Sequence, residues 1–224
     1  MFEGKYSKLL TGLLIVGIII IVGVIGFIGF SIIRDSMLKT DAEDAVEQFQ
    51  GKVNGIKNEE QTENNVFVNG VTPIIGLENI IVGGNSSNTN TQTYKGFPMV
   101  GTIEIPAINL KCPILETASK SAIEVAVAVY DGPGLNKVGN TTIVGHNYRN
   151  GTFFSNNKKL VNGDKVYITD LSGKKITYVI YNTYTTSPED SSYLERDTQG
   201  KREISLLTCT DDAKSRLIIF AKEN

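Results

Sequence analysis

An uncharged segment near the start of the chain constrains its organisation more than any other feature. Leu9 to Ile33 is a run of 25 residues made mainly of Leu, Ile, Val, Gly and Phe. As a helix it is about 37 Å long, which is enough to cross the hydrocarbon core of a bilayer with some tilt. The run ends at Arg34 without a small-residue cleavage pattern. We therefore expect residues 1–35 to form a cytoplasmic stub and an uncleaved transmembrane anchor.

Charged residues on either side of this segment do not fix its orientation in a membrane. Lys5 and Lys8 precede the segment, and Arg34 and Lys39 follow it. Because positive residues mark the cytoplasmic side, two on each flank leave both orientations open. The side on which the rest of the chain lies therefore has to be inferred from its function.

Residues 36–93 lie between the apolar segment and the main folded domain. Ser36 to Gln50 places its apolar residues at roughly helical spacing, which predicts a juxtamembrane helix. Gly83 to Thr93 contains no residue that anchors a core, and we expect a flexible tether there. Val66 to Val82 holds scattered Val and Ile around Pro73, and the pattern leaves open whether it folds back on the domain.

A single β-rich domain is expected over residues 94–224. Short runs enriched in Val, Ile, Thr and Tyr are separated by Pro, Gly, Asn and Asp, a texture typical of a barrel or sandwich. Two stretches, Ser119 to Tyr130 with its small apolar residues and Thr152 to Leu160, are predicted to be helical instead. The predicted strands are 100–105, 110–115, 141–144, 165–169, 176–184, 204–209 and 216–221.

Charge and cysteine usage argue against two classes of function. The formal net charge is −2, so the chain has no basic field to attract a phosphate backbone, and we expect no nucleic-acid partner. Cys112 and Cys209 belong to no CxxC motif or Cys/His cluster, so we expect no metal site. A disulfide between them stays open, because an exported domain meets an oxidising compartment.

The last two predicted strands place two chemically useful side chains together. If residues 210–215 form the loop of an antiparallel hairpin, residues whose numbers sum to 225 pair across it. Cys209 and Arg216 then become direct neighbours on one face. A cation beside a thiol favours the nucleophilic thiolate. A fixed guanidinium also stabilises the oxyanion that forms when a thiolate attacks an amide.

His146 completes the set of groups that acyl transfer requires. It is the only histidine in the chain and follows an apolar run, in the sequence Thr-Thr-Ile-Val-Gly-His-Asn. Imidazole is the usual proton donor and acceptor near neutral pH. Cys112, by contrast, lies within the run Asn-Leu-Lys-Cys-Pro-Ile-Leu, where a packing role is expected.

Together these residues resemble the sortase signature. The run from Ser205 to Cys209 (Ser-Leu-Leu-Thr-Cys) is similar to the TLxTC strand of that family, with Ser205 where the family usually has Thr. A Gly-His pair ending at His146 lies about sixty positions upstream, and Arg216 follows the cysteine by seven positions. The resemblance extends over roughly 101–221. It includes Gly-Thr-Ile-Glu-Ile-Pro from Gly101, Gly-Asp-Lys-Val from Gly163 and Ser-Pro-Glu-Asp from Ser187.

The resemblance implies an eight-stranded β-barrel and a cysteine transpeptidase that cleaves an LPXTG-like sorting signal between Thr and Gly. In that reaction Cys209 is the nucleophile, His146 the acid and base, and Arg216 the oxyanion donor. Thr208 is then a substrate-binding residue that supports substrate positioning. The acyl fragment passes from a thioester to an amino group of a peptidoglycan cross-bridge or its precursor, with neither ATP nor a metal cofactor. The enzyme is then expected in the cell membrane, crossing it once, with its catalytic domain outside.

The subclass within the family is inferred from weaker features of the same resemblance. The single N-terminal anchor, the absence of a C-terminal span and the short loop between cysteine and arginine look more like class A, D or E sortases than pilin-polymerising ones. We favour class D.

Other functions remain open at this point. In L,D-transpeptidases and papain-like peptidases the cysteine and histidine are arranged differently, and a histidine 63 positions before the cysteine disfavours both. A membrane-tethered β-domain that only binds a ligand or partner, with Cys209 and His146 as bystanders, is a non-enzymatic alternative. Such a domain loses no function on Cys209→Ala.

Overall fold

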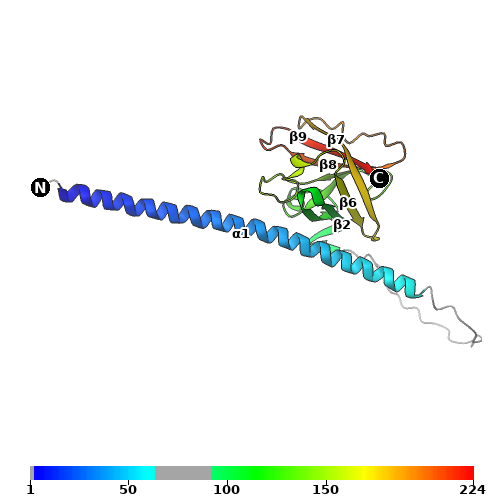
Figure 1. Cartoon of the computed structure of the whole chain (residues 1–224), viewed down its shortest axis with the longest axis horizontal. Helices are drawn as coiled ribbons and strands as arrows, with labels where there is room; N and C mark the ends of the chain where they lie inside the picture. Colours follow the sequence, from blue (N-terminus) through cyan, green and yellow to red (C-terminus); the bar gives the residue numbers. More distant parts are fainter. Residues whose placement is uncertain (1–2, 64–91) are drawn as a thin grey trace, which may run out of the picture. The chain divides into compact units, whose positions relative to one another are not determined.

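The computed structural model describes residues 3–63 and 92–224, which contain one long helix and a β-barrel (Figure 1). The long helix is α1 (Glu3–Glu63), and the short helical segments are η1 (Pro106–Ile108), α2 (Lys120–Ile123) and η2 (Asn157–Lys159). The strands are β1 (Gln92–Tyr94), β2 (Phe97–Ile105), β3 (Leu110–Leu115), β4 (Val127–Asp131), β5 (Gly139–Val144), β6 (Lys165–Asp170), β7 (Lys175–Thr186), β8 (Arg202–Cys209) and β9 (Arg216–Glu223).

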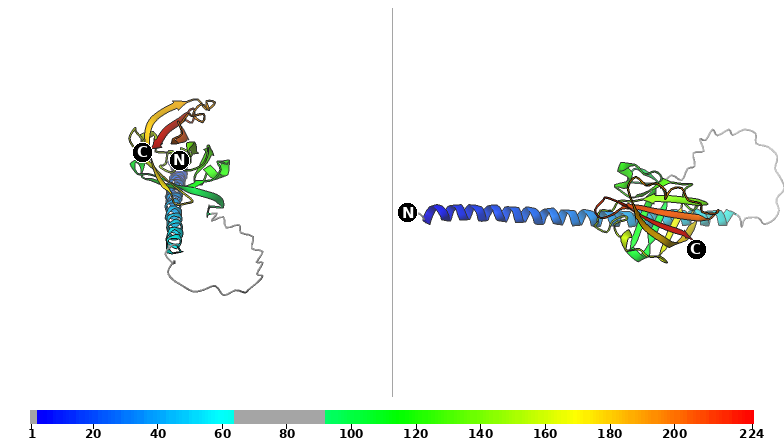
Figure 2. Two further views of the ribbon diagram at one scale, coloured as in Figure 1. Left: turned by 90° about the vertical axis from the view of Figure 1, so that its right-hand side faces the viewer. Right: turned by 90° about the horizontal axis from the view of Figure 1, so that it is seen from above.

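Eight of these strands close into a barrel, which confirms the predicted fold. Their order is β2-β3-β4-β5-β8-β9-β7-β6, and β2 also pairs with β6, so the sheet meets itself. β1 adds to β2 outside the closed ring. The β3–β4 and β5–β8 pairs are parallel and the others antiparallel. Figure 2 shows the barrel from two further directions.

The barrel interior is filled by the alternate side chains of its strands. Ile103, Ile143, Leu206 and Ile219 are fully buried in one apolar cluster to which most barrel strands contribute. Because side chains along a strand alternate between faces, their neighbours point outward. Because the sheet closes on itself, each of the eight strands has a neighbouring strand on both sides. The C-terminal end of β8 is thus part of a rigid wall.

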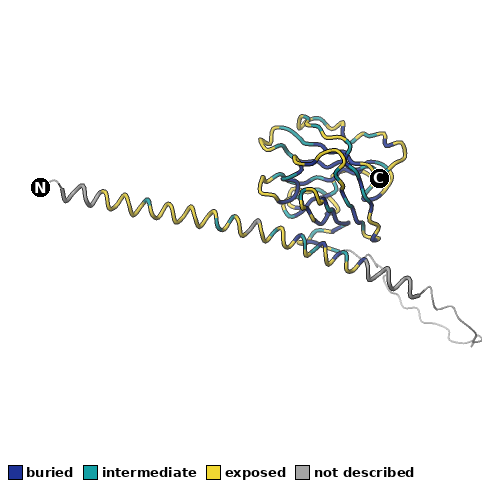
Figure 3. Tube along the Cα trace, viewed as in Figure 1, coloured by how far each residue is buried: buried dark blue, intermediate teal, exposed yellow. Residues whose placement is uncertain are grey.

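The first part of α1 is a strongly apolar helix with exposed side chains. Residues 10–33 are nearly all solvent-exposed (Figure 3), with a mean hydropathy of 3.1 in the most apolar window. In water such a surface is unfavourable, whereas in a bilayer it faces lipid. The helix is long and apolar enough to cross a membrane.

Residues 42–53 of the same helix have a different character, because they belong to the unit that contains the barrel. Ala42, Val46, Phe49 and Val53 recur at helical spacing and are buried. Phe49 and Val53 are part of the barrel's apolar cluster. Gln50 donates a side-chain hydrogen bond of 2.7 Å to Glu104 in β2.

α1 runs without interruption through residues 35 and 36, where the predicted anchor ends and the predicted juxtamembrane helix begins. It continues over residues 51–63, for which no element was predicted. The helix predicted for residues 36–50 lies within it. Residues 66–82 and most of the predicted Gly83–Thr93 tether lie outside the described residues, while Gln92 and Thr93 already belong to β1.

Two predicted helices are wrong in this structure. Over Ser119–Tyr130 only α2 is helical, and Val127 onward is the strand β4. β4 lies between β3 and β5, so its small apolar residues are those of a buried strand. Over Thr152–Leu160 the chain forms turns and the 3₁₀ segment η2 instead of an α-helix.

Candidate active site

The β8–β9 hairpin pairs Cys209 with Arg216, as the sequence predicts. Arg216 Nη1 donates a hydrogen bond to Cys209 Sγ at a distance of 3.4 Å. Both side chains are half-buried, and both cysteines of the chain are free thiols. The Cys209 thiol therefore lies beside a fixed positive charge and stays accessible.

The turn between β8 and β9 is held by its own hydrogen bonds. The Thr210 N–H donates to the Ser215 carbonyl at 3.0 Å, and the Thr210 hydroxyl accepts from the Ser215 N–H at 3.2 Å. Ala213 adopts a φ of 59°, and its N–H donates to the Thr210 carbonyl at 2.9 Å. These contacts fix the two strand ends and with them the juxtaposition of thiol and guanidinium.

His146 lies just beyond β5, beside the end of β8. The two strands are parallel, and their last pair is Val144 with Leu207. The ladder continues one step further, because the Gly145 N–H donates to the Leu207 carbonyl at 3.1 Å. In this register His146 stands opposite Cys209. Among the hydrogen bonds of the described residues, none joins the imidazole directly to the thiol.

Thr208 ties the same two strands together from inside. Its side chain is only 2% exposed, and its hydroxyl donates to the Gly145 carbonyl at 2.7 Å. A Cβ at position 145 would lie 2.8 Å from Val127 Cγ1 and 2.9 Å from Phe154 Cδ2, so the backbone approaches its neighbours as only glycine can. The structure thus places the hydroxyl of Thr208, the predicted substrate-binding residue, against the backbone that precedes His146.

The surroundings of His146 favour its neutral form. Burial lowers the pKa of the imidazole below its ordinary value, and the carboxylate of Glu124 opposes this effect only in part. The Tyr148 ring lies beside it, with ring centroids 4.9 Å apart. The Phe154 N–H donates to the His146 carbonyl at 3.1 Å, which holds the loop that carries the ring. At neutral pH the imidazole is thus ready to accept a proton.

Cys209 and Arg216 belong to the outer face of the barrel. Because side chains alternate, Cys209 projects to the same side as Leu207, and Arg216 to the same side as Ile218. Leu207 and Ile218 pack with Tyr193 in a second apolar cluster, separate from the barrel core. Tyr193 comes from the connection between β7 and β8. All three residues are buried, so Cys209 and Arg216 lie at the margin of a packed apolar cluster on the outer face of the barrel.

Ser205, which replaces the threonine usual in the resembling motif, is far from this chemistry. It is fully buried, and its hydroxyl donates to Asn140 Oδ1 at 2.9 Å. A hydroxyl on a small side chain is all that this contact requires. The substitution therefore leaves the strand end at Cys209 undisturbed.

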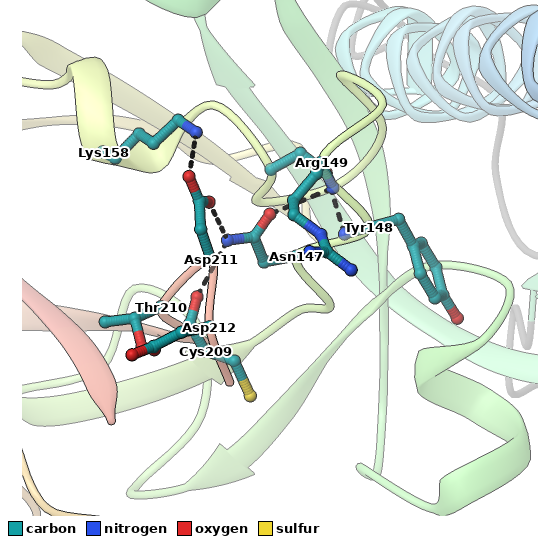
Figure 4. A network of polar contacts seen from close by, with 9 residues as sticks. Asn147, Tyr148, Arg149, Lys158, Cys209, Thr210, Asp211 and Asp212 are labelled. Atoms are coloured by element: carbon teal, nitrogen blue, oxygen red, sulfur yellow. Dashed lines mark hydrogen bonds and ion pairs between the residues drawn. The ribbon is translucent and has the colours of Figure 1, made fainter. Parts of the chain in front are cut away.

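Sequence reasoning missed a polar network beside the site. Asn147, Asp211 and Lys158 connect the loop after β5 with the loop after β8 (Figure 4). The only available signal was position, since Asn147 follows His146 and Asp211 lies two residues after Cys209. Position alone does not reveal that these side chains meet.

Comparison with known proteins agrees with this arrangement. The sortase domain model matches residues 103–224, more than half of the chain. Sortase A of Bacillus anthracis is 30% identical over 125 residues, which cover 54% of this chain and 58% of that protein. The match thus spans a little over half the length of this curated relative.

Solved structures give the same fold. Sortase A from Corynebacterium diphtheriae, in a lid mutant, has a TM-score of 0.53 at 27% identity and covers 57% of this chain and 71% of that chain. A sortase D5 transpeptidase from Clostridium perfringens has a TM-score of 0.57 and covers 83% of this chain and 99% of that chain. At 24% identity the second likeness shows the fold alone. The matched residues 103–224 include His146, Cys209 and Arg216. The chain belongs to the sortase family of cysteine transpeptidases.

Proposed function

We propose that this chain cleaves an LPXTG-like sorting signal between Thr and Gly and joins the acyl fragment to an amine of the cell wall. The observation that carries the proposal is the contact of Arg216 with the Cys209 thiol at the end of a rigid hairpin. His146 follows the neighbouring parallel strand in the same register. A nucleophile, a proton carrier and an oxyanion donor are the groups that acyl transfer requires.

In the first half-reaction Cys209 becomes acylated. The neutral imidazole of His146 takes the thiol proton, and the sulfur attacks the carbonyl carbon of the Thr–Gly bond. The negative charge that develops on the carbonyl oxygen is stabilised by the guanidinium of Arg216. His146 then gives its proton to the glycine nitrogen, the C–N bond breaks, and a thioester remains on the enzyme.

In the second half-reaction an amine, in place of water, accepts the acyl group. The amino group of a peptidoglycan cross-bridge or its precursor attacks the thioester while His146 removes a proton from the nitrogen. The C–S bond breaks, and the proton returns to the sulfur. Because the thioester conserves the energy of the cleaved amide, the reaction needs no nucleotide.

The same proposal assigns a location. The apolar part of α1 serves as a single-pass anchor, since its exposed residues 10–33 match a bilayer in length and polarity. A cell-wall amine lies outside the membrane, so the barrel faces the extracellular side. Within the family we propose class D, and the six-residue loop between Cys209 and Arg216 argues against the pilin-polymerising classes.

Thr208 has a supporting role in this scheme. Its buried hydroxyl holds the Gly145 carbonyl, so we propose that it positions His146 and acts on the substrate only indirectly. Thr208→Val keeps the volume and removes this bond. We expect it to lower kcat more than it raises KM for the peptide.

A quenched fluorescent peptide that contains an LPXTG-like motif tests the proposal. Wild-type enzyme should cleave it, and added amine should divert the acyl fragment from hydrolysis to ligation. Cys209→Ala is the control. If wild type cleaves none of a set of related motifs, the chain is better described as a binding domain. Equal cleavage by Cys209→Ala would show that Cys209 is not the nucleophile.

A further inference from the structure

The side chain of Asn147 joins the loop after β5 to the loop after β8. Asn147 Nδ2 donates to the Cys209 carbonyl at 3.0 Å and to Asp211 Oδ1 at 2.9 Å. Lys158 Nζ pairs with Asp211 Oδ2 at 2.5 Å. Figure 4 shows the amide between the two loops, with the Cys209 sulfur pointing away from it. These contacts connect the loop that carries His146 with the backbone of the nucleophile.

Both ends of the Asn147 amide are used, which fixes its orientation. Oδ1 accepts a hydrogen bond from the Arg149 N–H at 3.1 Å. The group that faces Cys209 and Asp211 is therefore the NH₂, whose two donors meet two acceptors. A carboxylate at this position keeps the bond from Arg149 but loses both donations and adds a like charge opposite Asp211.

The amide extends the strand ladder beyond the point where the backbone leaves it. In the β5–β8 pair the Gly145 N–H donates to the Leu207 carbonyl. Two residues further along, the corresponding donor and acceptor are residue 147 and the Cys209 carbonyl. At this step the side-chain NH₂ of Asn147 makes the bond. His146 thus lies between two points of attachment to β8.

Asn147 carries more of this connection than the ion pair does. The Lys158 and Asp211 side chains are 47% and 48% exposed, and an exposed pair of this kind contributes little. The bond from Asn147 to the Cys209 carbonyl is partly buried and anchors the backbone of the nucleophile itself. Asp211 and Lys158 act mainly by holding the amide in place.

We propose that Asn147 is a positioning residue that sets the separation between the His146 imidazole and the Cys209 thiol. The inference rests on the proposed function, in which this separation governs proton transfer. A displacement of about 1 Å in such a site costs on the order of 10²-fold in rate. We expect loss of the amide to lower kcat about tenfold or more, with a smaller change in KM.

Asn147→Asp is the sharpest variant, because it is isosteric and keeps the bond from Arg149. Asn150→Asp is its matched control in the same loop. Asn150 Oδ1 accepts from the Thr152 N–H at 3.0 Å and from the Thr152 hydroxyl at 2.7 Å, and a carboxylate retains both bonds. The control adds the same charge without touching the β8–β9 loop. It should keep kcat within about twofold of wild type, because no contact is lost.

The double variant Asn147→Asp/Asp211→Asn exchanges the donor and the acceptor in the hydrogen bond between positions 147 and 211. The amide introduced at position 211 can donate to the carboxylate introduced at position 147, and the net charge equals that of wild type. The bond to the Cys209 carbonyl is still lost, so we expect partial recovery of kcat relative to Asn147→Asp alone. If the loss of kcat in the double variant equals the product of the losses in Asn147→Asp and Asp211→Asn, the loops are not coupled through this contact.

A second readout is independent of turnover. His146 is the only histidine, so its Cε1–H gives one NMR signal. We expect that signal to shift and broaden in Asn147→Asp, to stay unchanged in Asn150→Asp, and to move back toward wild type in the double variant. Equal signals in Asn147→Asp and Asn150→Asp would overturn the inference. Because this comparison needs no substrate, it decides the positioning role even if wild type fails to cleave any sorting-signal peptide.

Discussion

The two cysteines stand in opposite surroundings, one in the middle of β3 and one at the end of β8. Cys112 is 1% exposed, and burial raises the pKa of its thiol to about 12. Cys209 is half-buried and accepts a hydrogen bond from Arg216. The same side chain is therefore an inert core residue in one strand and the candidate nucleophile in the other. Position within the strand, buried in its middle or half-exposed at its end, decides which role a thiol takes.

The largest difference between the two regions is expected in catalysis. Cys209→Ala should remove essentially all cleavage and ligation of a sorting-signal peptide, because it removes the atom that becomes acylated. Cys112→Ala should retain more than about half of the activity and lose about 1 kcal/mol of unfolding free energy, since it leaves a small cavity. Peptide assays and denaturant titrations measure the two effects. Comparable activity loss in both variants would erase the distinction.

Selective alkylation sharpens the same comparison. With a thiol pKa of about 12, only about one part in 10⁴ of Cys112 is thiolate at pH 8. Iodoacetamide should therefore modify Cys209 to completion while Cys112 stays free until the protein unfolds. Peptide mapping by mass spectrometry reports both sites. Early labelling of Cys112 would mean that β3 opens far more readily than its burial implies.

Removal of the Arg216 guanidinium tests what makes Cys209 different from Cys112. Arg216→Ala should lower kcat by about 10²–10³-fold, the usual cost of one oxyanion donor. Arg216→Lys should fall between this variant and wild type, because an ammonium keeps the charge but not the planar set of donors. Steady-state kinetics gives the values. A change confined to KM would assign Arg216 to peptide binding instead.

The smallest expected effect concerns the pKa of His146. Burial lowers it below 6.5, and the Glu124 carboxylate raises it in part, so Glu124→Gln should lower it further. The folded state thus disfavours the imidazolium, and the contribution of His146 to folding stability is complete above pH 6.5 and declines as the pH falls below it. NMR titration of the single histidine measures the midpoint. A midpoint above 6.5 would indicate a partner carboxylate that outweighs burial.

The contact that the sequence encodes best is a local one. A hairpin with a six-residue loop has few registers, so the pairing of Cys209 with Arg216 follows from counting. The position of His146 beside Cys209 depends on the parallel β5–β8 pair, whose residues are 63 apart and share no local signal. The expectation that His146 and Cys209 act together therefore came from the resemblance to the family motif and not from residue spacing.

Other errors have the same physical origin. Residues 127–130, the first part of β4, were predicted to be helical because they are all apolar or aromatic and lack the period of two, with Val127 and Ala128 fully buried. β1 was missed since its three residues are largely polar. The Asn147 contacts were not foreseeable, as side-chain bonds between two loops leave no periodic trace. Burial of Phe49 in the barrel core was equally hidden, because the helical spacing of its segment gives no partner.

The central claim is that Cys209 carries the acyl fragment, and intact-protein mass spectrometry tests it most directly. Wild-type enzyme mixed with an LPXTG-like peptide, without amine and quenched in acid, should gain the mass of the fragment ending at Thr. Proteolytic mapping should then locate that mass on the peptide containing Cys209, and added amine should discharge it. An adduct on any other residue would contradict the account. So would a wild-type enzyme that cleaves the peptide but shows no change in its own mass at any quench time.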